Sequence, residues 1–344
     1  MNSTGELVEV VLPGRVEPEE LRIRRGAVPA PGPGQVVIRT EATGVSFAEQ
    51  QMRRGRYYDQ PPFPFVPGYD LVGTVLAAGE GADPALTGTR VAALVKVGGW
   101  ASHVLVDAAD VVPVPDGVGA AEAETLVVNG VTAWQMLHRK ARVRAGHTVV
   151  VHGANGGVGS VLVQLALAAG ARVIGTASAR HHDALRDQGV VPVDYRAGDV
   201  AARIRALAPG GVDAVFDHVG GRGITDSWRL LAPGGTLVSY GSASTRDAEG
   251  SKQWPVIKLL LRVWLWNALP NRRSACFYNV WAGKALAGNR FRSRLRADLT
   301  QVFAALQRGE VTARIAAQLP LARVAEALRL AESGTVAGKV VLVP

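Results

Sequence analysis

The chain has 344 residues, a length that exceeds one ordinary hydrophobic core and predicts two domains. Its 48% hydrophobic and 19% charged residues predict a compact globular protein. The formal net charge is +9, but no basic cluster with interleaved aromatic residues accompanies it, so we expect a solvated basic surface and no nucleic-acid partner. The single cysteine, Cys276, excludes an intrachain disulfide and a zinc site built from four cysteines.

Neither a secretory signal nor a membrane span is expected. The N-terminal residues M-N-S-T-G-E-L contain no basic region followed by an apolar run. The longest apolar stretch, residues 256–269, is interrupted by Lys258, Arg262 and Asn267 and is too short to cross a bilayer. We therefore expect a cytoplasmic protein with no membrane partner.

The first third of the chain is predicted to be rich in β-structure. Gly and Pro recur between short apolar segments, and P-A-P-G-P-G at residues 29–34 is a turn that neither a helix nor a central strand tolerates. This pattern predicts a barrel-like or irregular β domain. The expected strands are residues 7–12, 35–42, 71–77, 90–95 and 101–106.

From residue 120 the pattern changes to a helix and then to alternating strands and helices. Such alternation predicts an α/β fold with a parallel sheet covered on both faces. The expected strands are residues 149–151, 171–176, 190–195, 212–217 and 235–240, and the helices between them are 161–169, 181–188, 199–207 and 224–231. An amphipathic, tryptophan-rich segment (252–268), a strand (275–281), two helices (292–308 and 321–332) and a last strand (338–343) are expected to follow.

The segment V-V-V-H-G-A-N-G-G-V-G-S, residues 149–160, is typical of the start of a dinucleotide-binding βαβ unit. The motif needs small residues for a tight turn, for close approach of the backbone to the pyrophosphate, and for close packing of helix and strand. Ala154, Gly156 and Gly159 fill these places, with Asn155, Gly157 and Val158 between them. The pyrophosphate is then expected at the first helical turn. The alternative is a purely structural turn.

Six further segments resemble one enzyme family along nearly the whole chain. They are G-V-S-F-A-E-Q-Q-M-R-R-G-R-Y (44–57), P-F-V-P-G-Y-D-L-V-G (64–73), N-G-V-T-A-W (129–134), V-D-Y-R (193–196), F-D-H-V-G-G (216–221) and A-G-K-V-V-L (337–342). Together with A-N-G-G-V-G they resemble the medium-chain dehydrogenase/reductase superfamily, and within it the zinc-independent quinone oxidoreductase and enoyl reductase branch.

The resemblance implies an architecture of two domains. Residues 1–125 and 286–344 would form a GroES-like β-rich catalytic domain, and residues 126–285 a Rossmann domain with a doubly wound parallel sheet. The active site would lie in the cleft between them. The family commonly dimerises through the edge strands of its Rossmann sheets, so residues 275–280 are the candidate edge of a homodimer; an ordinary strand closing its own sheet is the alternative.

The cofactor type is predicted from the end of the second Rossmann strand. NAD enzymes usually place Asp or Glu there for the ribose hydroxyl, but no acidic residue occurs between Gly175 and Asp183. Ser178, Arg180 and His182 offer donors and positive charge that suit a 2′-phosphate, and Tyr195 matches a family position that contacts it. We therefore predict NADPH, with a solvated helix start as the alternative.

The nicotinamide side is assigned through the resemblance. Asn129 and Thr132 match family positions near the nicotinamide. Thr132 is a candidate catalytic residue that could hydrogen-bond the substrate carbonyl or the ribose, and a bond to its own helix backbone is the alternative. Gly241 and Ser242 follow a strand whose carboxyl end lines the cofactor crevice. Lys339 matches the tail segment that closes over the nicotinamide, and a surface charge is its alternative.

No metal site is predicted. A catalytic zinc needs about three protein ligands, but Ser46 stands where the zinc branch has cysteine, and His103 is isolated. Tyr57 matches the family tyrosine at the active-site mouth, with Tyr58 and Tyr69 as competitors and aromatic packing as the alternative. The chain departs from the branch in having Ser46 for asparagine and Glu49 for aspartate, so Ser46 keeps a hydroxyl donor with a shorter reach.

These residues predict a zinc-free reductase that uses NADPH to transfer hydride to a conjugated C=C bond or a quinone. The tryptophan-rich segment suggests a bulky apolar or aromatic small-molecule substrate, but dimer packing explains the same residues equally well. One alternative is a biosynthetic tailoring enzyme of the same fold that performs a specialised reduction, cyclisation or isomerisation. The other is a nucleotide-regulated binding protein at membranes.

Overall fold

The computed structural model describes residues 5–221, 223–241 and 254–344. Ser242, and the first two residues of the tryptophan-rich segment, lie outside these ranges. The chain divides into two compact units, each described here by itself. Unit 1 comprises residues 1–131, 286–309 and 313–344, and unit 2 comprises residues 132–285 and 310–312.

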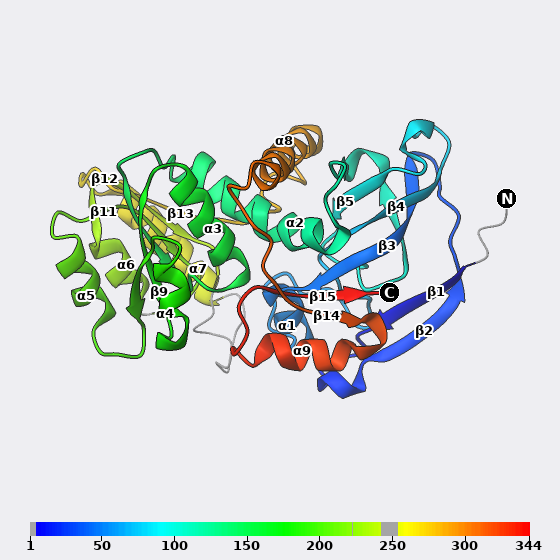
Figure 1. The fold of residues 1–344 in the computed structure, drawn as a ribbon, viewed down its shortest axis with the longest axis horizontal. Helices are drawn as coiled ribbons and strands as arrows, with labels where there is room; N and C mark the ends of the chain where they lie inside the picture. The colour runs from blue at the N-terminus through cyan, green and yellow to red at the C-terminus, as the bar shows by residue number, and fades with distance from the viewer. Residues whose placement is uncertain (1–4, 222, 242–253) are drawn as a thin grey trace. The chain divides into compact units, whose positions relative to one another are not determined.

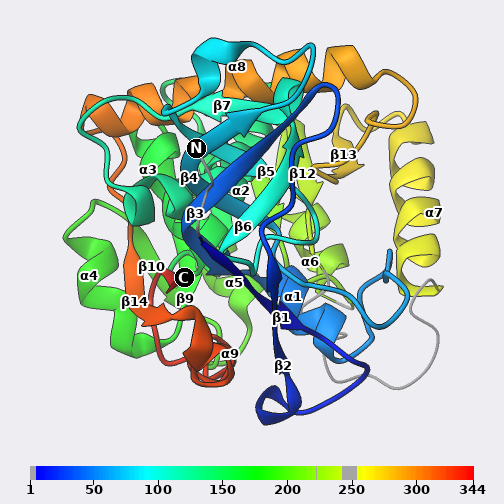
Figure 2. The ribbon, with the colours of Figure 1, turned by 90° about the vertical axis from the view of Figure 1, so that its right-hand side faces the viewer.

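Unit 1 is built on a seven-stranded sheet in the order β14-β15-β3-β4-β5-β7, with β6 paired to β3. The strands are β3 (Gln35–Val45), β4 (Asp70–Ala78), β5 (Arg90–Leu94), β6 (His103–Asp107), β7 (Val111–Pro113), β14 (Ile315–Pro320) and β15 (Lys339–Val343). The C-terminal tail thus returns to the first sheet, because β15 pairs antiparallel with β3. A separate hairpin is formed by β1 (Glu6–Val11) and β2 (Arg22–Ala27), which Figure 2 shows side by side.

Four helices accompany this sheet in the described part of unit 1. They are α1 (Phe47–Arg53), the larger part of α2 (Ala120–Trp134), α8 (Gly288–Gln307) and α9 (Val324–Glu332), with short 3-10 turns at residues 18–20, 84–86, 108–110 and 321–323. The predicted helices near residues 120, 292–308 and 321–332 are confirmed, whereas α1, β2, β7 and β14 were not predicted. The unit boundary falls inside α2, between Val131 and Thr132.

Unit 2 contains a six-stranded sheet in the order β10-β9-β8-β11-β12-β13, and every pair of neighbours is parallel. The strands are β8 (Thr148–His152), β9 (Arg172–Ala177), β10 (Val191–Asp194), β11 (Val212–Asp217), β12 (Leu231–Ser239) and β13 (Ser274–Phe277). The order reverses between β8 and β11, as in a doubly wound fold. The predicted α/β class, a β-rich domain plus a parallel sheet, is confirmed. The expected strand 275–281 is shorter and ends at Phe277.

Helices connect these strands (Figure 1). They are α3 (Gly157–Ala168), α4 (His182–Arg186), α5 (Val200–Leu207), α6 (Ile224–Arg229) and α7 (Trp254–Ala268), and a π-helix, Gln135–Lys140, extends α2. One core joins α5, α6 and α7 to the sheet and includes Val150, Ile174 and Leu237. Trp228 of α6 stacks on Trp266 of α7 with ring centroids 4.9 Å apart. From β8 the chain adds β9 and β10 on one side, and it then returns to add β11 and β12 on the other side. Right-handed crossovers therefore place α3 on the face opposite to α5 and α6.

None of the helices in the described ranges is long and apolar enough to cross a membrane.

Candidate functional site

The glycine-rich turn of unit 2 has the geometry of a phosphate cradle. β8 ends at His152, Gly153 adopts a φ of +68°, and α3 begins at Gly157. A Cβ atom on Gly159 would lie 2.0 Å from the Gly153 carbonyl oxygen, so only glycine permits this close approach of helix and turn. Within the turn, the residue with left-handed backbone is Gly153. Ala154 is buried against β9, where a Cβ on Gly175 would lie 2.7 Å from the Ala154 methyl group.

The residues at this turn fit the pyrophosphate of a dinucleotide. Gly156 precedes α3 in extended conformation and supplies no side-chain cap. The first N–H groups of a helix have no partners inside the helix, so at Gly157, Val158 and Gly159 they can bind an anion. Asn155 and Gly156 lie in the same turn, and Gly156 is exposed.

The residues predicted to contact a 2′-phosphate follow two neighbouring strands: Ser178, Arg180 and His182 come after β9, and Tyr195 comes after β10. Ala177 of β9 is in register with Asp194 of β10, which brings the segments after these strands side by side. Arg180 is exposed, and its Nε donates to His181 Nε2 at 3.2 Å. Tyr195 is exposed, and the Arg196 guanidinium lies 5.5 Å from its ring centroid. Arg196 was not among the predicted site residues, although the motif V-D-Y-R contains it.

Two of the predicted phosphate contacts are buried. His182 is 9% exposed, and its Nε2–H donates to the Ala177 carbonyl at 3.2 Å, so one ring nitrogen already stabilises the end of β9. Ser178 is 6% exposed. Arg180 and Tyr195 are thus the more accessible candidates. Burial and the neighbouring Arg180 lower the pKa of His181, so this side chain is neutral at physiological pH.

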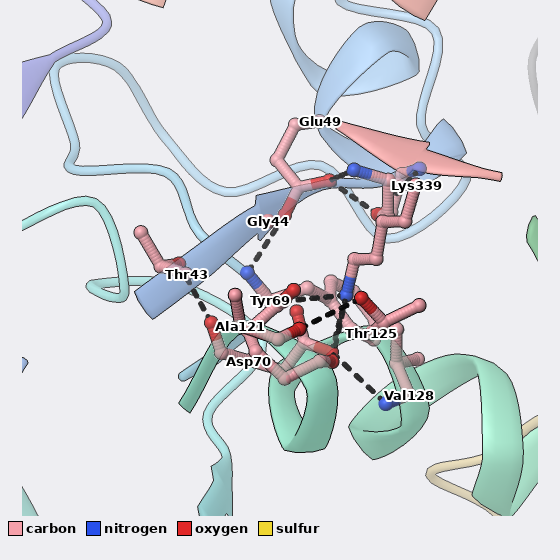
Figure 3. A network of polar contacts seen from close by, with 12 residues as sticks. Thr43, Gly44, Glu49, Tyr69, Asp70, Ala121, Thr125, Val128 and Lys339 are labelled. Atoms are coloured by element: carbon pink, nitrogen blue, oxygen red, sulfur yellow. Dashed lines mark hydrogen bonds and ion pairs between the residues drawn. The ribbon is translucent and has the colours of Figure 1, made fainter. Parts of the chain in front are cut away.

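In unit 1, Lys339 is the centre of a buried ionic cluster (Figure 3). Its Nζ lies 2.7 Å from Asp70 Oδ2 and 2.6 Å from Glu124 Oε1. Asp70 Oδ2 also accepts the backbone N–H of Val128 at 2.9 Å. A Cβ on Gly44 would lie 2.2 Å from Lys339 Cε, so glycine makes room for the lysine. The cluster joins the starts of β4 and β15 to α2 and to the end of β3.

The ionic groups of this cluster change one another's pKa values, and this compensates for their burial. Burial raises the pKa of Glu124 well above its usual range, against the opposing effect of Lys339. Burial alone would lower the pKa of Lys339, but Asp70 and Glu124 outweigh it and raise the pKa. Glu124 therefore holds its proton to a higher pH than an exposed glutamate does, and with that proton in place one ammonium faces one carboxylate. Lys339 is 3% exposed, so the alternative of a surface charge is wrong, and its ammonium binds carboxylates in this structure.

Two of the three predicted catalytic residues, Ser46 and Tyr57, are linked through Glu49 and Tyr69. Ser46 caps α1: its hydroxyl accepts the Ala48 N–H and donates to Glu49 Oε2. Glu49 Oε1 accepts the backbone N–H of Tyr69 at 2.7 Å, and the hydroxyls of Tyr69 and Tyr57 lie 2.9 Å apart. Burial raises the pKa values of Glu49 and Tyr57, so Tyr57 keeps its proton and acts as a hydrogen-bond donor or acceptor.

The remaining predicted residues lie on α2 and after β12. Asn129 and Thr132 are 5% and 7% exposed and lie three positions apart on α2, hence on one face. Gly241 follows β12, where a Cβ would lie 2.8 Å from the His218 carbonyl oxygen. Ser242 lies outside the described residues.

Potential metal ligands are dispersed over residues 5–221, 223–241 and 254–344, which contain no group of three or more His, Cys, Asp or Glu that could hold a metal ion. His103 Nδ1 lies 3.0 Å from the Ser102 hydroxyl.

Comparisons with known proteins relate both units to one family. The family described as "Alcohol dehydrogenase GroES-like domain" matches residues 32–116, and the one described as "Zinc-binding dehydrogenase" matches residues 188–342. The synaptic vesicle membrane protein VAT-1 homolog of Rattus norvegicus is 35% identical over 341 residues, which cover 96% of this chain and 82% of the relative.

Solved structures are similar over the whole length. A mycobacterial protein complexed with NADPH has a TM-score of 0.82 and 29% identity, with 98% of this chain and 100% of that chain covered. A quinone oxidoreductase of Pseudomonas syringae has a TM-score of 0.83 and 26% identity, with the same coverage of 98% and 100%. The chain therefore belongs to the medium-chain dehydrogenase/reductase superfamily.

Proposed function

We propose that the protein is a zinc-free, NADPH-dependent oxidoreductase that reduces a conjugated C=C bond or a quinone. The observation that carries this proposal is the turn at Gly153–Gly159, in which a Cβ on Gly159 would lie 2.0 Å from a carbonyl oxygen beside the uncapped start of α3. The similarity to a structure complexed with NADPH and to quinone oxidoreductases supports it. Bound NADPH would supply a hydride.

The chain's own residues suit this reaction without a metal. Ser46 has a hydroxyl in place of the thiolate that could bind zinc, and this hydroxyl already caps α1 and donates to Glu49. A conjugated carbonyl accepts the negative charge that follows hydride addition, and a neutral hydrogen-bond donor can stabilise that charge. Because its pKa is raised, Tyr57 remains protonated and can donate such a bond, with Tyr69 orienting its hydroxyl.

The cofactor preference is expected to depend on Arg180. Arg180→Ala should weaken NADPH binding about tenfold, the loss of one charge-assisted hydrogen bond to a phosphate, and leave NADH binding unchanged. Titration of each cofactor against the protein's fluorescence measures both affinities. Arg186→Ala is the matched control, because Arg186 lies on the same helical segment but pairs with Asp183. An equal loss of NADPH and NADH affinity would contradict the assignment.

The reaction can be identified by following NADPH absorbance with four acceptors: a quinone, a small enone, an aromatic enone and an enoyl thioester. A product two hydrogens heavier than an enone would establish alkene reduction, and turnover of quinones alone would establish quinone reduction. NADPH binding without consumption would favour a specialised biosynthetic reaction or a binding protein.

A homodimer is part of the proposal. β13 is the edge strand of the sheet in unit 2, and α7, which packs on it, exposes Trp254, Leu261 and Trp264. Exposed apolar groups of this size favour an interface. Light scattering of the intact protein is expected to give twice the 36.1 kDa chain mass, and Leu261→Glu to shift it toward the monomer. A wild-type protein that is monomeric at assay concentration would refute the dimer.

A further inference from the structure

A chain of side-chain hydrogen bonds lies beneath the glycine-rich turn and crosses three neighbouring strands. The Gly153 N–H donates to Thr176 Oγ1 at 3.1 Å, and the same oxygen lies 3.2 Å from His152 Nδ1. On the other side of the ring, His152 Nε2 lies 3.2 Å from Ser227 Oγ. Ser227 in turn donates to Asp217 Oδ2 at 2.7 Å.

The donors and acceptors of this chain determine the tautomer of His152. Asp217 accepts at both oxygens, because the N–H groups of Val219 and Gly220 donate to Oδ1 at 2.8 Å. The Ser227 proton is therefore directed at Asp217, and Ser227 Oγ must accept from His152 Nε2–H. Nδ1 is then unprotonated and accepts the Thr176 hydroxyl proton, which leaves Thr176 Oγ1 free to accept the Gly153 N–H.

The burial of these side chains and the pKa of His152 both support the Nε2–H tautomer. Thr176, Ser227 and Asp217 are each at most 3% exposed, so each of their polar atoms needs a partner. Burial lowers the pKa of His152 and outweighs the opposing effect of Asp217. The lowered pKa keeps the ring neutral. A protonated ring would present N–H groups at both ends and leave the Thr176 proton without this acceptor.

We propose that Thr176 and His152 are positioning residues, which act through the amide of Gly153 to hold the glycine-rich turn in the conformation that binds the cofactor pyrophosphate. The inference rests on the proposed nucleotide site and goes beyond it by assigning two residues that do not belong to the glycine motif's phosphate contacts. Gly153 carries the left-handed φ of +68°, and its N–H is tied to β9 through Thr176. The side-chain chain thereby couples the turn to the loop after β11.

The test separates the pyrophosphate end from the adenosine end of the cofactor. Calorimetry would measure two ligands, ADP-ribose, which contains the pyrophosphate, and adenosine 2′-phosphate, which lacks it. Thr176→Val removes the hydroxyl at nearly constant shape, and Thr176→Ser is the matched control that retains it. Thr176→Val is expected to weaken ADP-ribose about tenfold, because the Gly153 N–H loses its acceptor, while adenosine 2′-phosphate binding stays unchanged and Thr176→Ser binds both ligands as the wild type does.

Nitrogen NMR of the ¹⁵N-histidine-labelled, unliganded protein reads the tautomer directly. Wild type is expected to show His152 protonated at Nε2 with Nδ1 accepting, and Thr176→Val to shift the Nδ1 resonance. Equal weakening of both ligands, unchanged ADP-ribose affinity, or an Nδ1–H tautomer in wild type would overturn the inference. Failure of wild type to bind ADP-ribose would instead refute the proposed nucleotide site, and the NMR result would still decide the tautomer.

A second variant keeps the inference testable if Thr176→Val does not fold. Ser227→Ala removes the acceptor of His152 Nε2–H and leaves Thr176 in place. It is expected to abolish the preference for the Nε2–H tautomer and to weaken ADP-ribose less than loss of the Thr176 hydroxyl does. An unchanged tautomer together with an unchanged affinity would overturn the proposed coupling.

Discussion

Replacing Lys339 with methionine is expected to lower the free energy of unfolding by about 3–5 kcal/mol, the cost of breaking a buried ionic contact by removing one partner. Methionine leaves Asp70 and Glu124, both fully buried, facing each other without a cation. The folded-state pKa of Lys339 is raised, so its stabilising contribution is fully present at pH 7 and is lost only above about pH 10.4. Urea denaturation at pH 7, followed by circular dichroism, measures the loss.

Glu124→Gln is the matched control, because an amide resembles the protonated acid. The folded-state pKa of Glu124 is raised, so the folded protein binds this proton more tightly than the unfolded chain does. Stability from this group therefore falls as the pH rises from about 4.3 toward the raised pKa. The glutamine variant should lack this fall and be at least as stable as wild type at pH 8. A glutamine variant as unstable as Lys339→Met would contradict a protonated Glu124.

The same cluster shows why the role of Lys339 could not be predicted from sequence. The motif A-G-K-V-V-L identified the residue, but its partners lie 269 and 215 positions away. Only tertiary packing reveals that the ammonium ends between two carboxylates. By contrast, the helix α1 was missed although Ser46 and Glu49 form an S-x-x-E capping box, a local signal that predicts a helix start.

The elements that the sequence predicts well are those determined by their own residues. Three valines followed by glycines predict a buried strand and a turn wherever they occur, and β8 and α3 follow that prediction. β2 has the sequence R-I-R-R-G-A with every residue exposed, so it lacks an apolar period. It is a strand because it pairs with β1, where Arg24 bonds Glu9 at 2.8 Å. Likewise, β14 depends on its pairing with β15.

Within the candidate site, residue types were easier to predict than their surroundings. The absence of an acid after β9 predicts a phosphate-binding segment, and that assignment stays a prediction; only the structure shows that His182 bonds the Ala177 carbonyl. The hydrogen bonds of His152 were missed for a related reason: His152 immediately precedes the glycine motif, but Ser227 and Asp217 come from elements that follow it by more than 60 residues. The available signal was a polar residue that follows three consecutive valines at the end of β8.

Gly159→Ala is expected to have the largest effect on cofactor binding. The added Cβ would lie 2.0 Å from the Gly153 carbonyl oxygen, 2.9 Å from its carbon and 3.2 Å from Ala154 Cα, all backbone atoms that no rotamer change can move. Overpacking of this kind costs about 1–3 kcal/mol of stability. Since the displaced backbone is the phosphate cradle itself, NADPH affinity should fall about 100-fold, the equivalent of about 2.8 kcal/mol.

Two alanine controls separate the clash from a general effect of replacing glycine. A Cβ on Gly210, which precedes β11, meets nothing within 4 Å, so Gly210→Ala should leave NADPH binding unchanged. A Cβ on Gly156 would lie 3.3 Å from the same Gly153 oxygen, a distance that a small shift relieves, so Gly156→Ala should fall between the two. Calorimetric titration of NADPH orders the three variants. The clash at Gly159 disturbs the backbone whose N–H groups must contact the phosphates. A Gly159→Ala protein that binds NADPH as tightly as Gly210→Ala would therefore show that cofactor binding does not depend on this turn.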